Sequence, residues 1–134
     1  MTTVKIGEKE FNVTFGYEAT LKSKLLTRLA KASTSTEDGM LGNVEELLLF
    51  MPDFLLVGLQ KEHKNEYGYD LDTRKGYDDK RNKLFTLIAD AVDNGEVDCL
   101  ELFNELEKEL TRNGFLKKMF EKELEKIENT NENK

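Results

Sequence analysis

The sequence predicts an α+β fold that is mainly α, with an N-terminal β-hairpin followed by a bundle of about five short helices. Apolar and polar residues alternate on both sides of Gly7, whereas apolar residues recur every three or four positions in most of the remaining chain. A length of 134 residues suits one domain. We therefore expect a single domain over 1–134, with the hairpin at 4–15, a helical body at 17–128 and a flexible tail at 129–134.

Segment 4–15 predicts a hairpin because both arms have one apolar face and Gly7 can open a tight turn between them. The apolar residues of the two arms are Val4, Ile6, Phe11, Val13 and Phe15. An isolated hairpin is marginally stable in water, so this face has to pack on helices or join a larger sheet, which a neighbouring subunit could contribute. The sequence leaves that choice open.

The next segments predict a helix and a loop. Residues 17–32 have leucines at helical spacing with Lys and Arg between them, which indicates a basic amphipathic helix. Residues 33–42 contain two glycines and have no periodicity, so they predict a loop. This loop is expected to end near Asn43, a residue type that caps helices.

The most apolar stretch is 47–59, LLLFMPDFLLVGL, in which Asp53 is the only charge although 35% of the chain is charged. The stretch is too short and too interrupted to cross a bilayer. Pro52 has no amide proton and disfavours helical angles in the residue before it. We therefore expect two short helices, 44–50 and 53–62, or one kinked helix.

The second half of the chain predicts one loop and three helices. Segment 64–79 is rich in Gly, Asp and Tyr, which indicates a loop whose tyrosines anchor it to the body. Apolar spacing predicts helices over 79–92, 100–112 and 115–128. The first two are each followed by an Asn-Gly pair that suits a left-handed carboxyl cap, and we expect them to be antiparallel.

Composition argues against several classes of partner. The formal net charge of −7 disfavours nucleic-acid binding, because affinity for phosphate backbones rests on Lys and Arg. Cys99 is the only cysteine, so no intrachain disulfide can form, and its neighbours predict a buried thiol. The opening MTTVKIGEKEF has no basic region followed by an apolar stretch, so we expect no signal peptide, no membrane association and a cytoplasmic protein.

The residues predict no catalytic, cofactor or metal site, and we do not expect an enzyme. Residues 70–76 resemble the start of a calcium loop, but Arg74 stands where a third oxygen ligand is needed. His63 is the only histidine and lies between lysines, which is typical of a surface residue. The carboxylates beside Cys99 disfavour a reactive thiolate. Neither GxxxxGK[ST] nor GxGxxG occurs, so nucleotide binding has no support.

Four features together resemble the tail assembly chaperones of long-tailed bacteriophages and prophages, particularly those of Gram-positive hosts. They are the opening VKIGEKEFNVTFGYEATLK, the segment MPDFLLVGLQ, the Tyr- and Gly-rich connection, and the Glu- and Lys-rich helical ending. The resemblance covers most of the chain as an order of elements and is most specific over Ile6–Leu21 and Leu48–Leu59.

This resemblance implies a holdase. Such a protein coats the hydrophobic, helical tape measure protein and keeps it soluble and extended until the tail tube polymerises around it. It acts in the host cytoplasm and is absent from the mature virion. The resemblance further implies that this chain is the short form, and that a longer product of ribosomal frameshifting recruits the major tail protein.

Hydrophobicity, rather than a motif, selects the candidate contact residues. The stretch 47–59 and the stripe 116–127 predict either core packing or a groove for an apolar helix of another protein. The residues that we expect to contact a client or another subunit are Leu48, Phe50, Met51, Phe54, Leu55 and Leu59, followed by Phe115, Met119 and Phe120.

Two other classes of protein stay open at this point. One is a structural tail or head-completion subunit whose hairpin joins neighbours into a ring. The other is a small acidic adaptor that binds a host protein. The oligomeric state is also open, because the hairpin could support rings, spirals or a monomer.

Overall fold

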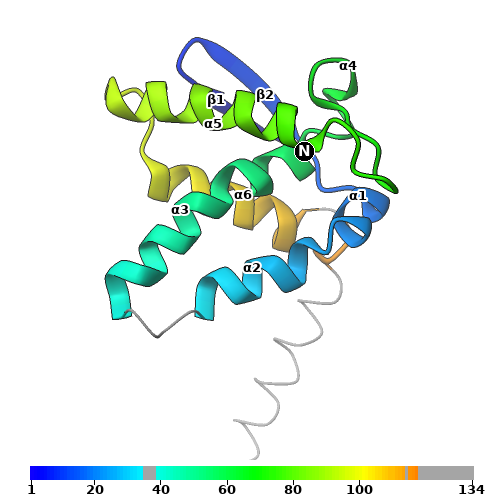
Figure 1. Ribbon diagram of the computed structural model, residues 1–134, viewed down its shortest axis with the longest axis horizontal. Coiled ribbons are helices and arrows are strands. Elements are labelled where there is room, and N and C mark those ends of the chain that lie inside the picture. Colours follow the sequence, from blue (N-terminus) through cyan, green and yellow to red (C-terminus); the bar gives the residue numbers. More distant parts are fainter. Residues whose placement is uncertain (35–38, 114, 118–134) are drawn as a thin grey trace, which may run out of the picture.

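The structure is a computed structural model that describes residues 1–34, 39–113 and 115–117. The structure confirms the predicted α+β, mainly α fold, with an N-terminal hairpin followed by six helices in the described part (Figure 1). In chain order the elements are β1 (Thr2–Ile6), β2 (Lys9–Val13), α1 (Tyr17–Lys22), α2 (Leu25–Thr34), α3 (Gly39–Gly58), α4 (Lys64–Tyr67), α5 (Tyr77–Asp93) and α6 (Cys99–Arg112).

The hairpin is confirmed, and its apolar face packs inside the chain. Ile6 pairs with Lys9 across a two-residue loop, and Gly7 has φ +64°, the position at which a type II′ turn takes glycine. The apolar residues of its two strands, Val4, Ile6, Phe11 and Val13, are buried. Just after β2, the amide of Thr14 donates to the carbonyl of Gly58 at 3.0 Å, which ties the hairpin to the end of α3. Of the two possibilities, packing on its own helices is the one realised.

α3 is the central helix, and it corrects two predictions. It runs without a break through Pro52, so the expected pair of short helices is wrong and the single-helix alternative holds. It also begins at Gly39, so Asn43 is not a cap, and the expected loop is helical at 33–34 and 39–42; residues 35–38 lie outside the described residues. Tertiary packing explains the passage through Pro52, because burial of residues 50–60 offsets the roughly 3 kcal/mol that an interior proline costs.

The predicted helix over 17–32 is interrupted, which the periodicity did not indicate. α1 ends in a tight turn in which the amide of Lys24 donates to the carbonyl of Leu21, and Lys24 itself has φ +56°. A left-handed residue after a helix end stops the helix. α2 therefore starts in a new direction and packs along α3 (Figure 1).

The connection before α5 is held by its tyrosines, as predicted. Tyr67, Tyr69 and Tyr77 are buried, and the last two rings meet edge to face at 5.0 Å. The buried amide of Gln60 fixes the backbone: it donates to the carbonyl of Tyr67 at 2.9 Å and accepts the amide of Tyr69 at 3.1 Å. The segment also contains the single-turn helix α4, which we did not predict.

The helices predicted over 79–92 and 100–112 correspond to α5 and α6. Gly95 has φ +73°, as the left-handed end of α5 requires, but Asn113 is extended at the end of α6. The two helices run in opposite directions in Figure 1, and both pack on α3. Residues 118–134 lie outside the described residues, so most of the predicted helix 115–128 and the tail stay predictions.

Candidate functional site

The structure separates the candidate contact residues into buried and exposed ones. Leu48 is exposed, with 43% of its surface accessible, and Phe115 is half-buried. The buried ones are Phe50, Met51, Phe54, Leu55 and Leu59. These five side chains therefore belong to the core, and Met51 also lines the groove described below; contact of these residues with a client stays a prediction. Met119 and Phe120 lie outside the described residues.

An apolar groove of about 340 Å³ lies between the first half of α3 and the start of α6. Its lining residues are Val44, Leu47, Leu48 and Met51 of α3 and Cys99, Leu100 and Phe103 of α6. Val44 and Leu48 are nearly half exposed, and Leu100 is 69% exposed. An apolar groove that is open to solvent is the usual form of a binding site for an apolar side chain or helix, so this groove is the candidate site.

The α3 side of the groove follows from helical spacing. Val44, Leu47, Leu48 and Met51 stand at i, i+3, i+4 and i+7, so they form one stripe along the helix. The accessibility of this stripe falls along the helix, from 45% at Val44 to 2% at Met51. Met51 therefore lies at the deep end of the groove, and its flexible thioether can adapt to different occupants.

The α6 side of the groove is held in place by a helix N-cap and by a contact between two aromatic rings. The carboxylate of Asp98 accepts the amides of Leu100 and Glu101 at 2.9 and 3.1 Å, which starts the helix directly beside the groove. The ring of Phe103 meets the buried ring of Phe54 edge to face at 5.6 Å. One wall of the groove is thus anchored to the core.

Cys99 is one of the residues that line this groove. Its side chain is partly buried; burial and then the nearby charge of Asp98 raise the pKa of the thiol. Thiols with a raised pKa are poor nucleophiles at neutral pH. Cys99 therefore contributes an apolar surface that is in contact with solvent.

A charged cluster holds the central helix in place. Asp53, almost fully buried, accepts the guanidinium of Arg28 at 2.8 Å and that of Arg81 at 2.9 Å. Arg81 also donates to the carbonyl of Leu49 at 2.9 Å. Because these arginines come from α2 and α5, one carboxylate joins three helices. The sequence shows that Asp53 is the only charged residue in 47–59, but it does not show that Arg28 and Arg81 are its partners.

Two further groups singled out in the sequence have structural roles. The carboxylate of Asp70 accepts the amides of Asp72 and Thr73, and these hydrogen bonds lower its pKa. His63 is not a plain surface residue: its ring is half-buried, and Nε2 accepts the amide of Asn12 at 2.9 Å. No group of three or more His, Cys, Asp or Glu residues suited to a metal ion occurs among the described residues.

Sequence reasoning missed the α6 half of the groove. The apolar spacing that predicts this helix runs through Leu100, Phe103, Leu106 and Leu110, whereas the buried leucines are Leu102, Leu106 and Leu110. The sequence did contain a signal for this half. Around the axis of α6, Leu100 and Phe103 lie outside the arc of the three buried leucines, so the apolar surface of the helix is wider than its buried face.

Comparisons of the chain with protein-family models, with curated proteins and with solved structures find no match in any of the three. Within the described ranges, no helix combines the length and apolar character needed to cross a membrane. A functional proposal therefore has to rest on the sequence pattern and on the groove.

Proposed function

We propose that this chain is a holdase of phage tail assembly that binds the helical tape measure protein in the groove between α3 and α6. The observation that carries the proposal is the exposure of Val44, Leu48 and Leu100 around one apolar groove. Helix-in-groove recognition uses such a surface, with client anchors at i, i+3 or i+4, and i+7.

The size of the groove suits weak, repeated binding. Burial of apolar surface contributes roughly 25 cal/mol per Å², and the fixed costs of association consume much of that gain at a small site. Many copies along one long client would still hold it, because avidity multiplies weak contacts. A holdase that has to leave before the tail is complete benefits from weak single contacts.

The charge of the chain supports the same role. At a net charge of −7, copies that coat a client repel one another and keep the assembly from aggregating. The proposal places this step in the host cytoplasm and the protein outside the mature virion. It also includes a longer frameshifted form that recruits the major tail protein.

The hairpin weighs against the structural-subunit alternative. That alternative needs the apolar face of the hairpin to join neighbouring subunits into a ring. Val4, Ile6, Phe11 and Val13 are instead buried within one chain. No observation on the described surface favours the acidic adaptor over the holdase.

Coexpression with the longest helical protein encoded downstream tests the proposal. Size-exclusion chromatography with light scattering measures whether the client becomes soluble and how many copies it carries. We expect co-elution at several copies per client, lost on Leu48→Asp with Leu100→Asp. Leu21→Asp is the matched control, because Leu21 is 44% exposed and lies on α1, away from the groove (Figure 1). A client that stays insoluble beside well-folded wild-type chain contradicts the proposal.

A further inference from the structure

We infer that the groove selects by charge as well as by shape, and that its occupant is an amphipathic helix whose apolar stripe is flanked by Lys or Arg. This inference rests on the proposed function, since it assumes that a client helix lies in the groove. It adds the chemical class of the client segment.

The parts of α3 and α6 that form the groove have no positive charge. α3 has no Lys or Arg anywhere in Gly39–Gly58, and α6 has none before Lys108, although the chain has 20 such residues. The same stretches contain several carboxylates, which are Glu45, Glu46, Asp53, Glu101, Glu105 and Glu107. The residues that line the groove are apolar, and every charge on these two stretches is negative.

Two of the carboxylates stand next to residues that line the groove. Glu45 follows Val44 directly and precedes Leu48 by three positions, so it borders the α3 wall. Glu107 comes one turn after Phe103, where the α6 wall ends. Both are exposed, and neither forms an ion pair within the part of the chain that the structure describes.

Positive charge gathers on another face of α3. A hollow of about 470 Å³ there is lined by Arg28, Lys31, Ala32, Glu46, Leu49 and Phe50. Arg28 and Arg81 are already paired with Asp53. None of these cations is among the residues that line the groove.

A basic-flanked helix fits this distribution. Its apolar stripe would fill the groove, and its Lys or Arg side chains would lie along the wall with their charged ends at the carboxylates of the rim. Charge complementarity of this kind decides between partners more than it adds affinity. Each exposed pair is weak, so the two together favour the basic helix by on the order of tenfold at low salt. The acidic rim also disfavours binding of α3 or α6 from a second copy.

Three synthetic peptides of about five helical turns test the inference. They share one Leu/Ala stripe and have Lys, Gln or Glu at the flanking positions, and fluorescence anisotropy measures their binding to the full chain. We expect the Lys peptide to bind about tenfold more tightly than the Gln peptide, and the Glu peptide to bind least. The preference for the Lys peptide should vanish near 1 M salt, because the Debye length falls to about 3 Å and the charges are screened from one another.

The outcomes separate this inference from the proposed function. Equal binding of the Lys and Gln peptides at low salt overturns the charge selection and leaves the holdase proposal standing. No binding of any of the three peptides contradicts the groove as a helix site, and with it the proposed function.

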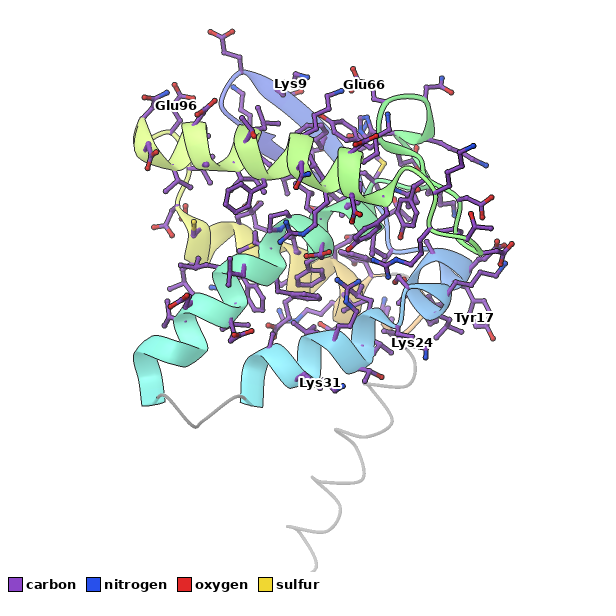
Figure 2. All side chains as sticks on the ribbon, viewed as in Figure 1. Lys9, Tyr17, Lys24, Lys31, Glu66 and Glu96 are labelled. Atoms are coloured by element: carbon purple, nitrogen blue, oxygen red, sulfur yellow. The ribbon has the colours of Figure 1, made fainter. Side chains whose placement is uncertain are left out.

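A pair of variants adds a matched control. Glu45→Gln with Glu107→Gln should abolish most of the preference for Lys while the Gln peptide binds as before. Glu62→Gln with Glu66→Gln removes the same charge from exposed positions around α4, far from the groove (Figure 2), and should leave the preference unchanged. The inference is overturned if the Glu45→Gln, Glu107→Gln variant keeps the full preference for the Lys peptide. It is also overturned if the Glu62→Gln, Glu66→Gln control loses as much of that preference.

Discussion

The two halves of α3 have similar apolar sequences and opposite surroundings. Every residue from Phe50 to Gly58 is buried among the hairpin and the neighbouring helices, whereas Val44, Leu48 and Leu49 are each more than 40% exposed. In Figure 1 the second half passes through the middle of the fold, and the first half extends beside α2 and the start of α6. Composition therefore marks where apolar surface is needed, and the packing of other elements decides whether it becomes core or a binding surface.

Mutation of the buried half should have the largest effect. Phe54→Ala removes a fully buried ring that contacts three other rings, so we expect a loss of about 3–5 kcal/mol in the free energy of unfolding. Urea denaturation followed by circular dichroism measures it. The exposed-half counterpart Leu48→Ala should change the same quantity by less than about 0.5 kcal/mol. Equal losses from the two variants would contradict the division of α3.

The charged cluster is the next test, because it holds the buried half against α2 and α5. Asp53→Asn leaves two arginines without their carboxylate, and we expect a loss of about 2 kcal/mol in the free energy of unfolding. This is less than for a fully buried pair, since both arginine side chains are more than a quarter exposed. Asp72→Asn, which breaks an exposed pair with Lys22, should cost at most about 0.5 kcal/mol. A neutral Asp53→Asn would show that the cluster does not stabilise the core.

Shortening an exposed side chain of the groove should weaken client binding without changing the stability of the fold. Leu48→Ala or Leu100→Ala should each weaken client binding about tenfold, about 1.4 kcal/mol, because each removes an apolar wall of the groove. Binding is measured by anisotropy with the Lys-flanked peptide, and folding by thermal denaturation. Leu21→Ala serves as the control, because Leu21 is as exposed as Leu48. The groove assignment is wrong if the control weakens binding as much as the groove variants do.

The smallest expected effect is a shift in the pH at which the thiol of Cys99 reacts with an alkylating reagent. Since its thiol has a raised pKa, the pH midpoint of its alkylation by iodoacetamide should lie above that of a free cysteine peptide, near 8.5. The thiolate forms only as pH rises through the raised value, so alkylation at neutral pH should be slow. Mass spectrometry follows the reaction, and a bound client helix should slow it further. A midpoint below that of the free peptide, or no protection by the client, would contradict the placement of Cys99 in the groove wall.

Local features of this fold were readable from the sequence. Gly7 between two alternating segments predicted the hairpin, and apolar spacing with Gly95 as terminator predicted α5 and α6. The buried tyrosines before α5 were also predicted. These features depend on residues near one another in the chain, which is the range over which periodicity and turn chemistry act.

The features that failed depend on distant parts of the chain. The passage of α3 through Pro52 is stabilised by helices and a hairpin that surround it, and the break at Lys24 lies within an uninterrupted apolar repeat. The groove combines residues 44–51 with residues 99–103, about fifty positions later. The sequence identified the apolar stretch but not which of its residues stay exposed, because exposure depends on what packs against them.

Photo-crosslinking tests the central claim most directly, that the first half of α3 and the start of α6 hold a helical client. Benzoylphenylalanine replaces Leu48 or Leu100 in the groove and, as controls, Leu21 or Phe85, which are exposed apolar residues elsewhere. After irradiation of the coexpressed complex, we expect crosslinks to the client from positions 48 and 100 and few from positions 21 and 85. Crosslinks of equal yield from all four positions, or from the controls alone, would contradict the account.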